Sequence, residues 1–123
     1  MATVLLVEDK ERYRVLVIGY LVKLGHTVIE ASTIQQALEL VEQLDSLGIN
    51  IAVLDGNLSS GDYSGKDGKK IAEAIKAKNP AVKTIAWSGF AYTWGDAFVP
   101  KNIFTEEEMN TLAQEIQRLL AEI

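Results

Sequence analysis

The sequence contains no cysteine and only two prolines among its 123 residues. The absence of cysteine excludes disulfides, thiolate metal sites and a cysteine nucleophile. No apolar run approaches the roughly 18 residues of a membrane-spanning helix, because the run 15–22 is short and contains Gly19. The N-terminus also lacks the basic region of a signal peptide and reaches its first acidic residue at Glu8. These absences predict a cytoplasmic protein that does not contact a membrane.

Basic residues are fewer than acidic ones. Twelve Lys and Arg stand against 17 Asp and Glu, which gives a net charge of −5 and argues against direct binding of nucleic acid. Hydrophobic residues make up 48% and charged residues 24%, as is typical of a globular protein. The length suits a single domain over residues 1–123, without internal repeats, linkers or low-complexity segments.

Short apolar runs alternate with helical patterns along the whole chain. The runs predict five strands, at Thr3–Val7, Thr27–Ala31, Ile51–Leu54, Val82–Trp87 and Ala97–Val99. Between and after them, apolar residues at helical spacing predict helices, which end at Gly25, at Gly48, before Pro80 and near Leu120. Such alternation is typical of an α/β fold with a doubly wound, five-stranded parallel sheet.

Local signals refine these boundaries. Asp9 is expected to cap the first helix, and Ser32 to Gln36 hold the spacings of a capping box for the second, which carries inward residues as far as Leu44. A third helix is expected from about residue 69 to residue 78. Residues 88–96 are rich in glycine and aromatic residues and show no clear helical stripe, so a fourth helix is expected to be shortened or absent.

Polar residues stand at the ends of four of these apolar runs. Glu8 and Asp9 follow the first run, Asp55 the third, Ser88 the fourth and Lys101 the fifth. Because parallel strands bring their carboxyl ends to one edge of the sheet, where open α/β sheets bind ligands, these residues should converge. Three carboxylates and one lysine at that edge would hold a divalent cation and receive a phosphoryl group.

The chain resembles the response-regulator receiver domains (CheY-like), whose flavodoxin-like sheet has the strand order 2-1-3-4-5. The matching motifs, in chain order, are Val4-Leu5-Leu6-Val7-Glu8-Asp9, Leu24-Gly25-His26-Thr27-Val28 with Glu30-Ala31, Ala37-Leu38-Glu39-Leu40, Val53-Leu54-Asp55, Trp87-Ser88-Gly89 and Phe98-Val99-Pro100-Lys101. They extend over essentially the whole chain and follow one another in the family's order.

This resemblance implies a function for each polar residue. Asp55 would be the phosphoacceptor, since a carboxylate can attack phosphorus to form an acyl phosphate. Asp9, Asp55 and, through water, Glu8 would bind Mg²⁺ together with the backbone carbonyl of Asn57.

The remaining residues of the motif would serve the phosphoryl group and the response to it. Lys101 and Ser88 would contact the phosphoryl oxygens, and fixed charges and donors of this kind are the main means of catalysing phosphoryl transfer. Ser88 and Phe98 would form the switch that reports phosphorylation, although an ordinary core position for the Phe98 ring is an equally good interpretation. Any enzymatic activity would be limited to phosphorylation and dephosphorylation of the chain's own aspartate.

Three departures from the family pattern stand out. The family usually has a proline after the lysine, with a cis peptide bond between them, whereas Asn102 follows Lys101 here and Pro100 precedes it. The separation between Ser88 and Lys101 is too short for a full fourth helix with its connections. The loop after Asp55 carries extra residues at 59–67, with Tyr63 among them.

Two hypotheses follow. The first is a stand-alone receiver that takes a phosphoryl group from a histidine kinase or a phosphotransfer protein and signals by binding a downstream protein, as a monomer or weak dimer. The second is a pseudo-receiver, an interaction module that keeps the fold without being phosphorylated. The retained Glu8, Asp9, Asp55, Ser88 and Lys101 favour the first.

Overall fold

Five parallel strands form one sheet with the order β2-β1-β3-β4-β5 in the computed structural model, which describes residues 2–56, 58, 64–89, 91–101 and 106–123. The strands are β1 (Thr3–Val7), β2 (Thr27–Ala31), β3 (Ile51–Asp55), β4 (Lys83–Ser88) and β5 (Ala97–Pro100). Each agrees with the predicted strand to within a residue or so. The predicted doubly wound sheet and its strand order are therefore confirmed.

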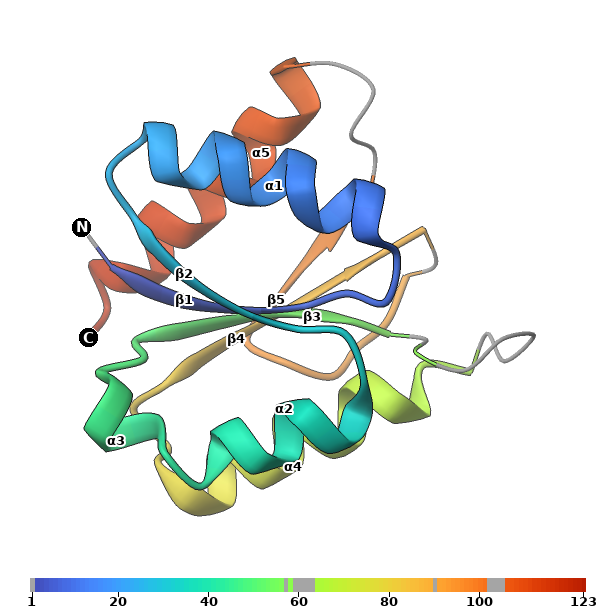
Figure 1. The fold of residues 1–123 in the computed structure, drawn as a ribbon, viewed down its shortest axis with the longest axis vertical. Coiled ribbons are helices and arrows are strands. Elements are labelled where there is room, and N and C mark those ends of the chain that lie inside the picture. Colours follow the sequence, from blue (N-terminus) through green and yellow to red (C-terminus); the bar gives the residue numbers. More distant parts are fainter. Residues whose placement is uncertain (1, 57, 59–63, 90, 102–105) are drawn as a thin grey trace.

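Helices cover both faces of this sheet. They are α1 (Glu11–Lys23), α2 (Ile34–Val41), α3 (Leu44–Leu47), α4 (Lys66–Lys78) and α5 (Glu106–Leu120). Figure 1 shows α1 and α5 on one side of the sheet and α2, α3 and α4 on the other. The result is a three-layer α/β/α arrangement in which every crossover returns a strand to the same direction.

The central strands contribute to the core on both faces, which explains why their sequences are continuous apolar runs. In β1, Val4 and Leu6 pack toward α1 and α5, while Leu5 and Val7 pack toward α2 and α4. All four side chains are fully buried. Packing against both cores holds β1 in position, and Glu8 and Asp9 directly follow its carboxyl end.

The start of α1 differs from the prediction. Asp9 is not its N-cap, because the helix begins at Glu11, with Lys10 in the cap position and no capping hydrogen bond from a side chain. The carboxylate of Asp9 instead lies with those of Glu8 and Asp55. The cluster of carboxylates therefore takes precedence over the local capping preference.

The predicted second helix is divided in two. Thr33 caps α2 by accepting a hydrogen bond from the backbone N–H of Gln36 at 3.1 Å, so the expected start is correct. The helix ends at Val41, however, and α3 begins only at Leu44. A left-handed Gly48, at φ 69°, ends α3 as predicted.

Between β4 and β5, the described residues 89 and 91–96 form no helix, as the short spacing predicted. Two aromatic rings of this segment, Tyr92 and Trp94, stack at 5.7 Å. They lie where glycines give them room: a Cβ at Gly56 would come within 2.3 Å of Tyr92, and one at Gly68 within 2.5 Å of Trp94. The α4 helix begins at Lys66, three residues before its predicted start.

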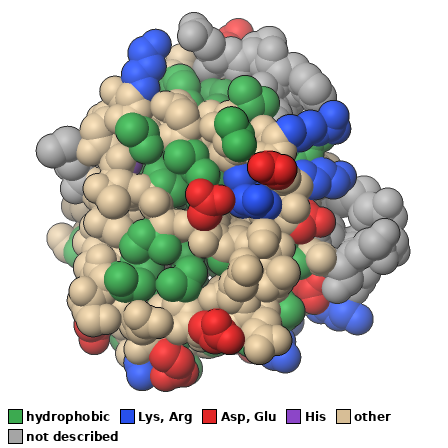
Figure 2. All heavy atoms as spheres, in the orientation of Figure 1, with side chains coloured by type: hydrophobic (Ala, Val, Ile, Leu, Met, Phe, Trp, Pro, Cys, Tyr) green, Lys and Arg blue, Asp and Glu red, His purple; other side chains and the backbone are tan. Residues whose placement is uncertain are grey.

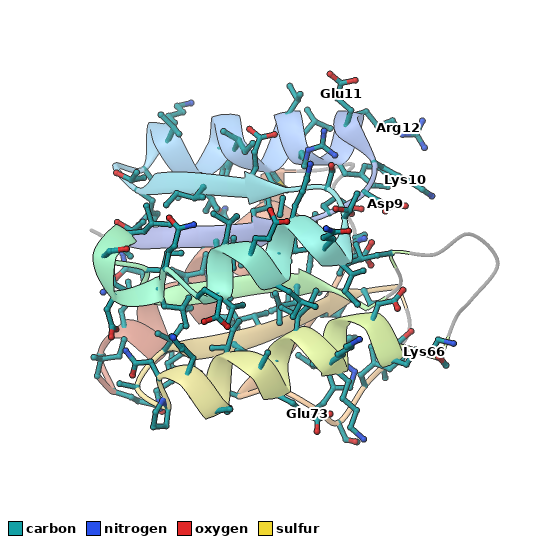
Figure 3. The ribbon with its side chains drawn as sticks, turned by 60° about the horizontal axis from the view of Figure 1, so that its bottom comes forward. Asp9, Lys10, Glu11, Arg12, Lys66 and Glu73 are labelled. Carbon is teal, nitrogen blue, oxygen red and sulfur yellow. The ribbon has the colours of Figure 1, made fainter. Side chains whose placement is uncertain are left out.

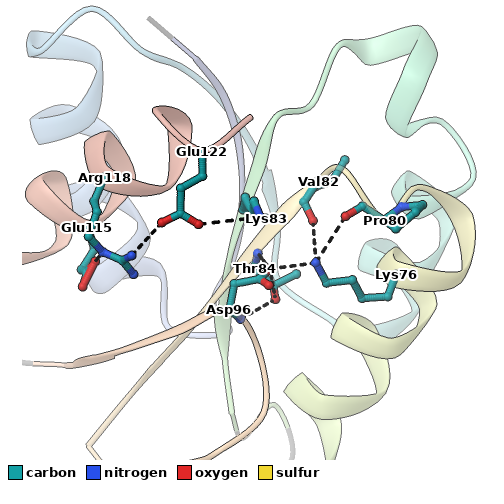
Figure 4. A network of polar contacts seen from close by, with 9 residues as sticks. All are labelled: Lys76, Pro80, Val82, Lys83, Thr84, Asp96, Glu115, Arg118 and Glu122. Atoms are coloured by element: carbon teal, nitrogen blue, oxygen red, sulfur yellow. Dashed lines mark hydrogen bonds and ion pairs between the residues drawn. The ribbon is translucent and has the colours of Figure 1, made fainter.

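The end of the same segment is held by polar contacts (Figure 4). Asp96 accepts hydrogen bonds from the backbone N–H and, at longer range, the hydroxyl of Thr84, and forms an ion pair of 2.9 Å with Lys76 of α4. The Asp96 backbone N–H donates to the Thr84 carbonyl at 2.8 Å. These contacts attach the segment to β4 and to α4 just before β5 begins.

Some apolar side chains remain on the surface. Figure 2 shows hydrophobic side chains scattered among polar ones on the face that carries α1 and β2. On α1 itself, Val15, Leu16 and Val22 are each more than half exposed. In the part of the chain that the structure describes, no helix is both long and apolar enough to pass through a membrane.

Candidate functional site

The predicted site residues lie at one edge of the sheet. Glu8 and Asp9 follow β1, Asp55 and Ser88 are the last residues of β3 and β4, and Lys101 follows β5. Figure 3 shows Asp9 and the start of α1 at the same end of the molecule as Lys66 at the start of α4. The sheet therefore gathers residues from four strands into one place, as expected from the parallel topology.

Three carboxylates form the centre of this site. Each of Glu8, Asp9 and Asp55 has an oxygen that lies within 4.8 Å of the others. Glu8 is fully buried and Asp55 is 5% exposed, whereas Asp9 is exposed to solvent. The cluster is thus open on the side of Asp9 and closed on the side of Glu8.

Glu8 is held firmly by its neighbours. Its backbone N–H donates to the carbonyl of Ala31 in the adjoining strand at 3.0 Å, and its side-chain Oε2 accepts from the backbone N–H of Lys10 at 3.1 Å. The Glu8 carbonyl accepts a hydrogen bond of 2.9 Å from Arg14, which also pairs with Glu30 at 3.2 Å. The carboxylate therefore has a defined position.

Lys101 brings a positive charge to the same point. Its Nζ lies 2.5 Å from Glu8 Oε1 and 3.2 Å from Asp55 Oδ1. The ammonium also lies 4.7 Å from the ring centroid of Trp87 and 5.7 Å from that of Tyr13. Its backbone N–H donates to the carbonyl of Ser88 at 2.8 Å, which continues the pairing of β4 with β5 past the last residue of the strand.

The carboxylates differ in how they hold protons. Burial, together with a hydrogen bond to Asp9 and the charge of Asp55, raises the pKa of Glu8 to about 8, even though Lys101 opposes this shift. Burial acts to raise the pKa of Asp9 as well, but its hydrogen bonds with Glu8 and Asp55 outweigh burial, and the pKa is lowered. Near neutral pH, Glu8 therefore holds a proton that a bound cation could displace.

These donors fit a magnesium ion. Mg²⁺ prefers oxygen ligands and binds proteins through one or two carboxylates together with water. Asp9 and Asp55 would supply the carboxylates, and Glu8 would bind through water. The predicted fourth contributor, the backbone carbonyl of Asn57, lies outside the described residues.

The two predicted switch residues occupy different surroundings. Ser88 is 2% exposed at the end of β4, beside Lys101. Phe98 is half-buried on β5, where it pairs in register with Ala86 of β4. The peptide bond between Lys101 and Asn102, which stands where the family usually has a cis bond to proline, also lies outside the described residues, as does Tyr63.

Sequence reasoning missed the aromatic surroundings of Lys101. Trp87 was placed at the end of the fourth predicted strand, directly before Ser88, and no contact with Lys101 was predicted for it or for Tyr13. The signal was present in the strand register, because Trp87 pairs with Asp55 on one side and with Val99 on the other. Only the folded arrangement shows that the lysine two residues beyond Val99 turns back toward this ring.

Neither a scan against protein-family models nor a search of curated proteins found a match. Solved structures do match. The receiver domain of the hybrid histidine kinase CckA is 24% identical, with a TM-score of 0.76 over 96% of this chain and 98% of that chain. A response regulator receiver protein from Sinorhizobium medicae is 21% identical, with a TM-score of 0.79 over 98% and 94%.

The response regulator TrrA from Thermotoga maritima has been solved with Mg²⁺ and BeF. It is 21% identical, with a TM-score of 0.75 over 97% of this chain and 99% of that chain. In another structure TrrA is in complex with the histidine kinase ThkA, with 21% identity and a TM-score of 0.74 over 98% and 99%. Together with the strand order, these similarities show that the chain has the fold of the CheY-like response-regulator receiver domains.

Proposed function

We propose that this protein is a receiver of two-component signal transduction that accepts a phosphoryl group on Asp55 in a Mg²⁺-dependent reaction. The observation that carries the proposal is one cluster of charges. Oxygens of Glu8, Asp9 and Asp55 lie within 4.8 Å of one another, and the ammonium of Lys101 lies 3.2 Å from Asp55. A nucleophile, a cation site and a fixed positive charge thus occur together at the edge where such folds bind ligands.

In the reaction, an oxygen of Asp55 forms a bond to phosphorus while the bond between phosphorus and a histidine nitrogen of the donor breaks. The electron pair of that bond stays on the imidazole nitrogen. Lys101 neutralises part of the charge on the phosphoryl oxygens, and the Ser88 hydroxyl offers a hydrogen bond to them. A bound Mg²⁺ would supply further positive charge at these oxygens.

The same surroundings govern hydrolysis of the acyl phosphate. Asp55 is only 5% exposed, so bulk water has little access to it. Hydrolysis requires a water molecule in line with the phosphorus–oxygen bond to Asp55, on the solvent side where Asp9 is exposed. Phosphorylation and hydrolysis are the extent of the chemistry that we propose for this single receiver domain.

The phosphoryl donor would be a histidine kinase or a phosphotransfer protein. Support comes from the similarity to TrrA, which forms a complex with a histidine kinase. The output would be the binding of a downstream protein by the monomer or a weak dimer, with Ser88 and Phe98 as the switch residues. A cytoplasmic location, without nucleic acid or a membrane as partner, belongs to the same proposal.

Phosphorylation can be tested with small phosphodonors. The protein is incubated with acetyl phosphate and Mg²⁺, and intact-mass spectrometry measures the gain of one phosphoryl group. We expect modification of the wild type, none of Asp55→Asn, and none of the wild type when EDTA removes Mg²⁺. The matched control is Asp45→Asn, because Asp45 lies in α3 outside the site, and this variant should react like the wild type.

Binding of beryllofluoride gives an independent measurement. The ring of Trp87 lies 4.7 Å from the Lys101 ammonium, so its fluorescence should change when a phosphoryl analogue reaches Asp55. Trp94→Phe removes the other tryptophan and leaves Trp87 as the only tryptophan, which excitation at long wavelength selects over the four tyrosines. If neither acetyl phosphate nor beryllofluoride affects the protein at millimolar Mg²⁺, the receiver proposal is wrong and the pseudo-receiver interaction module remains.

A further inference from the structure

The ammonium of Lys101 has both carboxylates and aromatic rings as close neighbours. Glu8 and Asp55 are 2.5 and 3.2 Å from Nζ, while the centroid of the Trp87 ring is 4.7 Å away. This distance is within the roughly 6 Å at which a cation is attracted to the face of an aromatic ring, and tryptophan attracts cations more strongly than the other aromatic residues. The Lys101 side chain is 15% exposed and Trp87 1%, so water weakens this attraction little.

The backbone alone does not place this ammonium. Asn102 and not proline follows Lys101, so no ring restricts the backbone there. The hydrogen bond of 2.8 Å from the Lys101 N–H to the Ser88 carbonyl fixes the backbone nitrogen of the residue but not its side chain. The flexible four-carbon stem of a lysine leaves the position of its charge to whatever surrounds it.

The attraction of the carboxylates alone is not sufficient to keep the Lys101 ammonium in position during the proposed reaction. Glu8 and Asp55 also belong to the cluster that would bind Mg²⁺. A cation bound there takes up their negative charge, which weakens their attraction for Lys101. The attraction of an aromatic face has no such competitor.

Trp87 fits this purpose better than Tyr13. Its strand pairs it with Asp55 on one side and with Val99 on the other, so the ring is part of the buried core beneath the site. Tyr13 is half-buried and lies 5.7 Å from the Lys101 ammonium. Its ring also faces the guanidinium of Arg12 at 4.9 Å, so it is shared between cations.

We propose that Trp87 is a positioning residue for Lys101. Its indole face holds the ammonium beside Asp55, where the charge meets the incoming phosphoryl group. The catalytic part of this inference rests on the proposed function, whereas the contact between the two side chains does not. An ordinary core role for Trp87 would depend on the volume and burial of the ring, and a positioning role also depends on the electron density of its face.

Fluorinated tryptophans separate these two roles, because fluorine withdraws electron density from the ring and changes its volume little. The Trp94→Phe variant, with Trp87 as its only tryptophan, is produced with tryptophan, 5-fluorotryptophan and 5,7-difluorotryptophan. We expect the rate of phosphorylation by acetyl phosphate to fall stepwise with each fluorine while the thermal midpoint stays constant. Trp87→Leu should lower the rate about 10-fold, which corresponds to loss of a well-shielded cation–π contact.

The matched control is Trp87→Phe, in which Trp94 is the only tryptophan. Trp94 does not face a cation among the described residues, so fluorination of this variant should leave its rate unchanged. Equal rates across the fluorinated series at Trp87, in a protein that is phosphorylated, would overturn the proposed role.

A second measurement does not need phosphorylation. In the NMR spectrum, the ε-methylene protons of Lys101 should be shifted upfield by the Trp87 ring current, and Trp87→Leu should abolish most of that shift. Absence of the shift in the wild type would overturn the inference. If the shift is present but acetyl phosphate does not modify the protein, the proposed function fails and the contact is confirmed as a structural one only.

Discussion

Lys101 Nζ lies 2.5 Å from an oxygen of Glu8, a residue whose side chain has no exposed surface. Asp55 is the second partner of the same ammonium, at 3.2 Å. One positive charge therefore faces two buried carboxylates, and the excess negative charge must be met by protons or by a cation. The predictions on pH and magnesium follow from this imbalance.

Glu8 should make the metal-free protein less stable as pH rises. Its pKa is raised from the ordinary value of 4.5 to about 8 in the fold, so between these values the folded chain holds a proton that the unfolded chain has released. The free energy of unfolding from this group therefore falls from about pH 4.5 to about pH 8. Thermal midpoints measured from pH 6 to pH 9 should decline more steeply for the wild type than for Glu8→Gln, which cannot lose the proton. Parallel curves would contradict the prediction.

Magnesium should stabilise the fold, and more strongly as pH rises. Binding of the cation displaces the Glu8 proton, so the apparent affinity should increase up to about pH 8 and level off above it. The stabilisation follows RT ln(1 + [Mg²⁺]/Kd) when the unfolded chain binds none. We expect the thermal midpoint at pH 8 to rise with millimolar Mg²⁺ in the wild type and much less in Asp9→Asn. A thermal midpoint that does not change with Mg²⁺ at any pH would exclude the proposed metal site.

Two glycine-to-alanine substitutions in helices should have opposite effects. A Cβ at Gly68 of α4 would lie 2.5 Å from the Trp94 ring and 2.7 Å from the Asp55 carbonyl oxygen, so Gly68→Ala should destabilise by about 1–3 kcal/mol. A Cβ at Gly19 of α1 would meet no atom within 4 Å, and Gly19→Ala should stabilise by about 0.5–1 kcal/mol. Urea unfolding measures both changes. Equal effects would show that the contact with Trp94 is not tight.

His26 should make the protein sensitive to mild acid. Burial lowers its pKa below 6.5, and the neutral ring accepts a hydrogen bond of 3.2 Å from the backbone N–H of Ala2 at Nδ1. The unfolded chain takes up a proton below pH 6.5 before the folded chain does, so stability from this group is complete above pH 6.5 and falls as pH drops below it. Unfolding curves at pH 7.5 and pH 5.5 should show a smaller loss for His26→Gln than for the wild type. An unchanged loss would assign the acid sensitivity to other groups.

The fold was predictable because local and global signals agree in its strands. Val4 to Val7 form a continuous apolar run, and the two cores on either side of the sheet require one. The local capping rule gave a wrong prediction at the site, where the carboxylate cluster competes with capping. Asp9 is a good capping residue by type, yet its carboxylate lies with Glu8 and Asp55, and α1 starts two residues later without a side-chain cap.

The charged half of the site was also predictable, because a parallel sheet brings strand ends together wherever they occur in the sequence. Its aromatic half was not. The apolar run that ends at Trp87 predicts a core residue there. Nothing in the order of the residues shows that the Lys101 ammonium lies over its ring. The contact of Trp94 with Gly68 was equally hidden, since the two residues belong to segments 26 positions apart.

That last contact restricts how the sequence can change. The aromatic segment before β5 packs against Gly56 and Gly68, so neither glycine can gain a side chain while Tyr92 and Trp94 keep their positions. Related sequences that carry a larger residue at position 68 should therefore have lost the indole at position 94, and the two positions should covary. Residue 68 is therefore a marker for sequences in which an aromatic ring packs against the start of α4.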